Sequence, residues 1–191
     1  FSLYFPTSPE MSITKQSVTV HECDPKKLWS ILSDWSAPFI TPANSPATVG
    51  SLEGSGVGAT RIVTMGEGAE APTWPEEVTA FDDVGMTWSY KLCGPLPGPF
   101  SVADHTTFTC TMSVADKDGK SEVTISGSFD LVEGASEDTL PPISEMYGGW
   151  ASAAAALANG VLKKVSVTTH DVDAKKLWSI LSDWSAPFIT P

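Results

Sequence analysis

Residues 86–114 read MTWSYKLCGPLPGPFSVADHTTFTCTMSV and contain two stretches in which apolar and polar side chains alternate. The first stretch places only large apolar side chains on one side: Met86, Trp88, Tyr90 and Leu92. The second stretch does the same with Phe108, Cys110, Met112 and Val114. A period of two residues is typical of a strand with one buried and one wet face. The two stretches therefore predict neighbouring strands with an apolar, aromatic inner face.

The chain on either side of these stretches continues the same pattern. A third apolar side follows, interrupted by Gly127: Val123, Ile125, Phe129 and Leu131. Five segments with turn-forming residues divide residues 47–132 into six expected strands. These turn segments are SLEGSGVGA, MGEGAEAP, FDDVG, CGPLPGP and ADKDGK. The glycine run GSGVGATR lacks the Lys-Ser/Thr and the following helix of a phosphate loop, so it is interpreted as a hairpin turn. The region predicts an antiparallel meander.

Two helices are expected around this meander. Val18 and Val20 alternate with Thr19 and His21 as in a half-buried strand, and Asp24 and Pro25 then begin a helix. Its apolar face is formed by Leu28, Ile31, Leu32 and Trp35. The segment from Ser36 to Pro46 ends that helix and is expected to hold one further short turn around Phe39 and Ile40.

A longer helix is expected from Pro142 to Lys164. Its apolar stripe consists of Ile143, Met146, Tyr147, Trp150, Ala154, Leu157 and Val161. Gly148 and Gly149 lie in its interior, where each costs up to about 1 kcal/mol relative to alanine. Only the apolar face of the sheet is large enough to cover this stripe. The predicted fold class is therefore α+β, with a curved antiparallel sheet wrapped around a long C-terminal helix.

The segment KKLWSILSDWSAPFITP occurs twice, at residues 26–42 and 175–191. The similarity extends upstream, where SVTVHECDPKK at Ser17 matches SVTTHDVDAKK at Ser166. We therefore expect a leader or tag-like segment at residues 1–10 and one complete domain at residues 11–163. Residues 164–191 would begin a second copy, repeating the first strand and helix at residues 15–42. Self-association through residues 164–191 is one expected consequence.

The composition restricts the class of partner. The chain has 23 acidic and 11 basic residues and a net charge of −12, which disfavours binding to nucleic acid and to anionic lipid surfaces. No apolar run approaches the roughly 20 residues that span a bilayer, so membrane insertion is not expected. The start FSLYFPTSPE lacks the features of a signal peptide. A soluble, cytoplasmic protein is the default, and a missing natural N-terminus leaves secretion or organelle targeting open.

The cysteines and histidines show no site of their own. The chain has Cys23, Cys93 and Cys110, none in a CxxC or in a Cys/His cluster with zinc-ligand spacing, so no metal or other cofactor is expected. Cys93 and Cys110 fall on neighbouring predicted strands, which would allow one disulfide in an oxidising compartment, with buried free thiols as the alternative. The three histidines are widely separated.

Five features of the chain occur in an order that is typical of one superfamily: LWSILSDW at residues 28–35, GVGATR at 56–61, EEVTAFDD at 76–83, WSYKL at 88–92 and the closing amphipathic helix. Together they resemble the START-like (SRPBCC) superfamily and its polyketide cyclase/dehydrase branch, which includes the major birch-pollen allergen. The resemblance covers Met11 to about Lys164. It implies a helix-grip fold with an apolar cavity between the sheet and the long helix, but it does not supply a reaction.

Two residues are candidates for chemistry in such a cavity. Arg61 could hold a carboxylate or enolate of a ligand, and the alternative is an ion pair with Glu76 or Glu77 on the next strand. Asp104 shares the alternation phase of Phe108 and could act as a general base at the cavity mouth, because an apolar site raises the pKa of a carboxyl group. The alternative places Asp104 in a loop before the strand. His105 falls in the outward phase.

Aromatic residues are candidates for the wall of the cavity. Trp88, Tyr90, Tyr147 and Trp150, together with Phe108, could surround a ligand, with their polar tips orienting it. Ordinary core packing is the alternative interpretation for residues at this spacing.

Three functions follow from these expectations. The first is binding or carrying of a small hydrophobic molecule, such as a lipid, polyketide, pigment or hormone-like compound. The second is an enzyme of the polyketide cyclase or dehydratase type that uses Asp104, Arg61 or Tyr90. The third is a structural or storage protein that assembles through its duplicated segment. An enclosed cavity with a polar cluster would favour the second function, and an apolar cavity would favour the first.

Overall fold

The computed structural model of the chain describes residues 12–41 and 44–161. Its elements follow in the order β1 (Ile13–His21), α1 (Pro25–Leu32), β2 (Ala47–Glu53), β3 (Thr60–Met65), β4 (Thr73–Asp82), β5 (Thr87–Leu92), the 3-10 turn η1 (Gly98–Val102), β6 (Thr109–Lys117), β7 (Lys120–Phe129), the 3-10 turn η2 (Glu137–Thr139) and α2 (Ile143–Ala158). The predicted α+β fold class and its helix-grip arrangement are confirmed.

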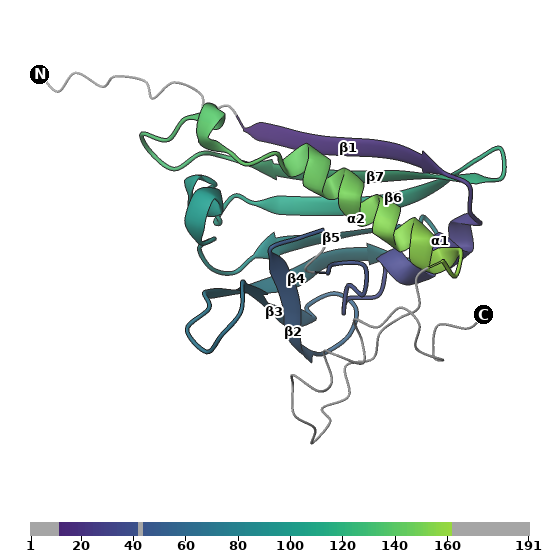
Figure 1. Cartoon of the computed structure of the whole chain (residues 1–191), viewed down its shortest axis with the longest axis horizontal. Coiled ribbons are helices and arrows are strands. Elements are labelled where there is room, and N and C mark those ends of the chain that lie inside the picture. The colour runs from purple at the N-terminus through teal and green to yellow at the C-terminus, as the bar shows by residue number, and fades with distance from the viewer. Residues whose placement is uncertain (1–11, 42–43, 162–191) are drawn as a thin grey trace, which may run out of the picture.

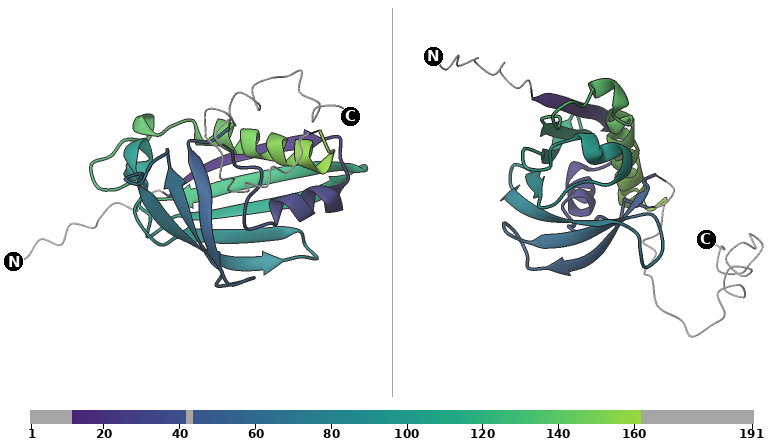
Figure 2. Two further views of the ribbon diagram at one scale, coloured as in Figure 1. Left: turned by 60° about the horizontal axis from the view of Figure 1, so that its bottom comes forward. Right: turned by 90° about the vertical axis from the view of Figure 1, so that its left-hand side faces the viewer.

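The seven strands form one antiparallel sheet in the order β1-β7-β6-β5-β4-β3-β2. The strands β2 to β6 each pair with the next strand in the sequence, and β1 pairs with β7. The edge strands of the sheet are therefore β1 and β2. The sheet curves around α2, which runs along its concave side, and α1 lies beside the C-terminal end of α2 (Figures 1 and 2). The hydrophobic core fills the space between the sheet and these two helices.

The helix α1 begins as expected and ends earlier than expected. The Asp24 carboxylate accepts a hydrogen bond from the Lys27 backbone N–H at 2.9 Å, and Pro25 is the first helical residue. The helix ends at Leu32, whereas the spacing predicted a stripe that continues to Trp35. The Asp34 carboxylate accepts hydrogen bonds from the backbone N–H and the hydroxyl of Ser36, which favours a turn over a further helical residue.

The alternation in β1 is present, but the valines lie on its outer side. Val18 and Val20 are about half exposed, whereas Ser17 and Thr19 lie on the half-buried inner side. The reason is the close approach of α2. A Cβ atom on Gly148 would lie 3.2 Å from Ser17 Oγ, so this part of the inner face has room only for small side chains.

The helix α2 runs through Gly148 and Gly149 and ends at Ala158, six residues before the predicted end at Lys164. Gly160 follows with φ of 70°, the left-handed conformation that commonly terminates a helix. Val161 was predicted to be part of the apolar stripe, and it is exposed. The predicted leader at residues 1–10 and the second copy at residues 164–191 lie outside the described residues.

Candidate ligand-binding site

A cavity of about 70 Å³ lies between the concave face of the sheet and α2. Its wall is built from β3, β4 and β5, from the segment that carries η1, and from α2. Most of this wall is apolar, with side chains such as Val63, Leu92, Phe100, Phe108 and Met146. The predicted apolar cavity under the long helix is therefore present, although it is small.

An outer groove of about 630 Å³ adjoins this cavity. Five residues line both spaces: Ser45, Pro46, Phe100, Ile143 and Met146. The remaining wall of the groove includes Pro99, Pro141, Pro142 and Glu145. Drug-sized ligands occupy pockets of roughly 300–1,000 Å³, which the cavity alone cannot offer. A ligand of that size would therefore extend from the cavity into the groove.

A buried ion pair closes one side of the cavity. Arg61 on β3 and Glu76 on β4 are register partners, and both are less than 5% exposed. The Nε and Nη2 atoms of Arg61 each lie 2.7 Å from Glu76 Oε2. The other carboxylate oxygen, Oε1, accepts a hydrogen bond from the indole N–H of Trp74 at 2.9 Å. Both oxygens of Glu76 are therefore engaged within the protein.

The turn after α1 holds Arg61 from the opposite side. The Nη1 atom of Arg61 donates to the Trp35 carbonyl at 3.0 Å, and its guanidinium carbon lies 3.8 Å from the centre of the Trp35 ring. The Tyr90 ring lies at 5.5 Å from the same carbon. A carbonyl, a carboxylate and two aromatic faces thus surround the cation, which is the usual condition for burying an arginine.

Three further polar groups meet at the centre of the sheet. Tyr90 and Cys110 are register partners on β5 and β6, and the Tyr147 hydroxyl approaches them from α2. Burial raises the pKa of the Cys110 thiol to about 12, although hydrogen bonds with Tyr90 and Tyr147 act to lower it. Burial also raises the pKa of both tyrosines well above the usual range. At neutral pH all three groups are protonated.

Gly127 creates the space for the Tyr147 hydroxyl. The sequence showed this glycine as an interruption in the apolar side of β7, between Ile125 and Phe129. A Cβ atom at this position would lie 2.4 Å from Tyr147 Oη, closer than any real contact. The missing side chain on β7 is therefore replaced by a hydroxyl supplied from α2.

The structure brings most of the predicted site residues together. Arg61, Tyr90, Phe108, Tyr147 and Trp150 line the cavity. Arg61 also forms the ion pair with Glu76 that was the alternative interpretation, so it has both features. Trp150 packs on Tyr147 with ring centres 5.4 Å apart. Its indole N–H is buried and has no hydrogen-bond partner within residues 12–41 and 44–161.

Trp88 and Asp104 do not line the cavity. Trp88 is buried core: its indole N–H donates to the Leu32 carbonyl at 3.0 Å, and its ring meets the edge of Trp35. Asp104 lies in the loop before β6, where its carboxylate accepts hydrogen bonds from the backbone N–H and hydroxyl of Thr106. These bonds lower its pKa. The geometry is that of a turn, which is the alternative position named for Asp104.

The sequence analysis missed several wall residues. Trp74 shares the buried side of β4 with Glu76, and this W-x-E alternation was a usable signal. Phe100 comes from η1, within a proline-rich segment that was interpreted only as a turn. Its contribution depends on how that turn folds back over the sheet, which the local pattern does not reveal.

The cysteines are all unpaired, so Cys93 and Cys110 are not bridged. Cys110 is buried as expected for a free thiol, whereas Cys93 is exposed just after β5. In the part of the chain that the structure describes, no three His, Cys, Asp or Glu side chains are arranged to hold a metal ion. No helix among these residues has the length and apolar character needed to cross a membrane.

Comparisons with known proteins agree with this architecture. The family model described as "Polyketide cyclase / dehydrase and lipid transport" matches residues 11–161. No match was found among curated protein sequences. Among solved structures, the chain is similar to the crystal structure of Ara h 8.0201, with a TM-score of 0.62 and 18% identity. That alignment covers 78% of this chain and 99% of the other, and at this identity it shows the fold alone.

Proposed function

Because this chain belongs to the polyketide cyclase/dehydrase and lipid transport family, we propose that it binds or carries a small hydrophobic molecule in the cavity between the sheet and α2. The observation that carries the proposal is the apolar cavity of about 70 Å³ that shares five wall residues with the larger outer groove. Apolar ligand surface would replace water along both spaces, which is the main source of affinity for such molecules.

The polar groups of the site support binding more strongly than catalysis. A cyclase or dehydratase needs a group that accepts or donates a proton near neutral pH. The Cys110 thiol and the two tyrosine hydroxyls have raised pKa values and stay protonated there. They act as hydrogen-bonding groups, and Asp104 lies in a turn outside the cavity. The carboxylate in the described wall, Glu76, has both oxygens engaged with Arg61 and Trp74.

Titration with Nile red, a neutral dye that fluoresces in apolar surroundings, tests this proposal. We expect saturable fluorescence and its loss when octan-1-ol is added. Ala103, a buried wall residue, offers a way to fill the cavity. The variant Ala103→Leu should weaken dye binding at least tenfold. Ala115→Leu adds the same atoms at an exposed position of β6 and should bind like the wild type. Equal binding by both variants would place the dye elsewhere and refute the proposal.

A second candidate function, self-association, is favoured by the repeated segment. In the first copy, Leu28 and Leu32 on α1 are fully buried against the rest of the domain. Leu177 and Leu181 occupy the matching positions in residues 164–191. We propose that the repeated segment competes for the α1 position of another chain and so joins molecules. A head-to-tail exchange of this kind can form rings or open chains.

A further inference from the structure

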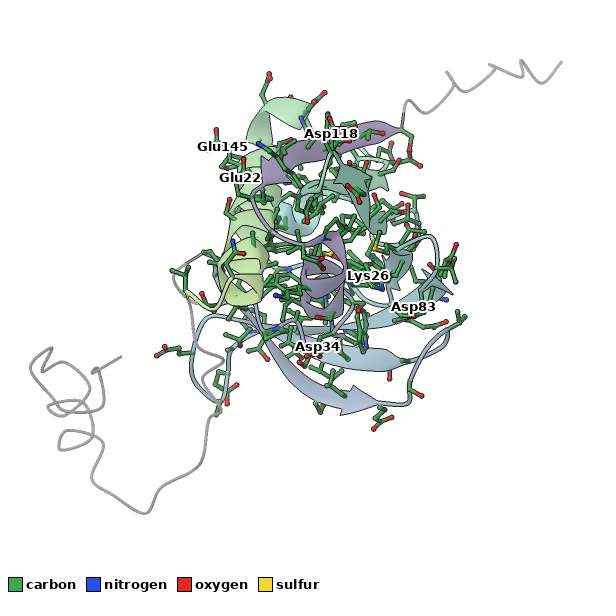
Figure 3. The ribbon with its side chains drawn as sticks, turned by 90° about the vertical axis from the view of Figure 1, so that its right-hand side faces the viewer. Glu22, Lys26, Asp34, Asp83, Asp118 and Glu145 are labelled. Atoms are coloured by element: carbon green, nitrogen blue, oxygen red, sulfur yellow. The ribbon has the colours of Figure 1, made fainter. Side chains whose placement is uncertain are left out.

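The charges in the wall of the cavity balance each other. Arg61 and Glu76 are its only charged members among the described residues. They are paired with each other at 2.7 Å, and both are less than 5% exposed. The outer groove adds one charged residue, Glu145, which is negative and lies exposed on α2 toward the outside of the molecule (Figure 3). No unpaired cation is therefore available in the wall to receive an anionic ligand.

Both members of the ion pair make further contacts within the protein. Glu76 accepts from Arg61 with one oxygen and from Trp74 with the other. Arg61 is held in addition by the Trp35 carbonyl and by the Trp35 ring. A ligand carboxylate that approached Arg61 would lie beside the Glu76 carboxylate, so two buried negative groups would share one cation. Burying an unpaired charge is far more costly than burying a neutral polar group.

Two further polar groups near the cavity offer nothing to a charged ligand. The indole N–H of Trp150 is buried without a partner within the described residues, and it does not reach the open space of the cavity. The Tyr147 hydroxyl is hydrogen-bonded with Cys110. Neither group carries a positive charge that would compensate for the burial of a ligand carboxylate.

From these observations we infer that the cavity is selective for uncharged molecules with an apolar body, and that it rejects free carboxylates. The inference rests on the proposed function and specifies its ligand class. It assigns the exclusion of anions to the Arg61–Glu76 pair together with Glu145.

Three probes of equal chain length test the inference on the wild-type protein: octan-2-one, octanoate and n-octane, each used to displace Nile red at pH 7.5. We expect octan-2-one to bind at least tenfold more tightly than octanoate. If octanoate binds as tightly as octan-2-one, the inference is overturned while the binding function stands. If none of the three displaces the dye, the proposed function itself fails, and the inference falls with it.

One variant tests the assigned role. Glu76→Gln releases Arg61, so the ratio of octanoate affinity to octan-2-one affinity should rise at least tenfold above the wild-type ratio. An unchanged ratio in a folded Glu76→Gln variant would refute the role of the ion pair. If Glu76→Gln does not fold, the comparison of octan-2-one with octanoate on the wild type still decides the exclusion of anions.

Discussion

At the scale of single residues, Arg61 combines two properties that the sequence presented as alternatives. It is ion-paired with Glu76, and it lines the cavity. The pairing could be predicted because the two residues stand on consecutive strands with one short turn between them. The surrounding shell could not, since Trp35 reaches Arg61 only after α1 ends at Leu32 and the chain turns back.

Removing one member of this pair should destabilise the fold. The variant Arg61→Met leaves Glu76 buried without its cation, which typically costs about 3–5 kcal/mol. Urea unfolding followed by tryptophan fluorescence measures the free energy of unfolding. The double variant Arg61→Met/Glu76→Leu removes both charges and should recover most of the loss. If Arg61→Met has the same free energy of unfolding as the wild type, the Glu76 carboxylate is solvated and not buried as the structure indicates.

Gly127 and Tyr147 form a second pair that can be tested residue by residue. A methyl group on Gly127 would collide with Tyr147 Oη, so Gly127→Ala should destabilise the protein by about 1–3 kcal/mol. The added carbon would lie 3.4 Å from Tyr147 Cζ, an acceptable contact once the hydroxyl is gone. In Gly127→Ala/Tyr147→Phe the loss should therefore be smaller than the sum of the two single losses in a double-mutant cycle of thermal unfolding. Additive losses would contradict the contact.

Asp104 shows why alternation alone can mislead about a site. Its position has the same parity as Phe108, so it would face inward if the strand began there. The strand β6 begins only at Thr109, and Asp104 instead folds back to accept hydrogen bonds from Thr106. Parity has no meaning outside the strand. The sequence contains a competing signal for this turn in the pattern D-x-T, because Asp side chains readily bind the backbone two residues ahead.

At the scale of elements, periodicity was sufficient for the strands and the long helix. All six strands between residues 47 and 132 and both helices were predicted from the spacing of apolar side chains. Periodicity did not predict which side of β1 is buried, because the apolar Val18 and Val20 indicated the wrong side. Packing decided otherwise: α2 approaches β1 closely at Gly148, and larger side chains are left to the outer face.

The two glycines in α2 should respond differently to alanine. A Cβ atom on Gly149 would meet no atom within 4 Å, so Gly149→Ala should stabilise the protein by up to about 1 kcal/mol through helix propensity. A Cβ atom on Gly148 would lie 3.2 Å from Ser17 Oγ, which should offset part of the same gain. Thermal unfolding of the two variants, side by side, gives the comparison. A larger gain at Gly148 than at Gly149 would argue against the close packing of α2 on β1.

At the scale of the whole molecule, the existence of the cavity was predictable and its size was not. Facing apolar stripes on the sheet and on α2 indicated an enclosed apolar space. Its volume of about 70 Å³ depends on Phe100 from η1, on Leu96 and Leu140 from loops, and on the large rings of Tyr147 and Trp150. How far such side chains fill the space follows from tertiary packing, which local patterns do not contain.

The repeated segment leads to a prediction about association. In sedimentation velocity experiments the full chain should form larger species as its concentration rises, whereas a chain cut after Lys164 should remain monomeric. The full-length variant Leu177→Ser/Leu181→Ser keeps the segment but removes its apolar face, and it should behave like the shortened chain. The exchange idea fails if the full chain and the shortened chain are both monomeric across the concentration range.

The most direct test of ligand binding in the cavity uses the methionine methyl groups as reporters in NMR spectra. Met65 and Met146 line the cavity, whereas Met112 is fully buried outside its wall and Met86 packs at the edge of the core. Titration with octan-2-one should shift the Met65 and Met146 methyl signals with one saturating curve and leave those of Met86 and Met112 in place. Equal shifts at Met65, Met86, Met112 and Met146, or no saturable shift at Met65 and Met146, would contradict binding between the sheet and α2.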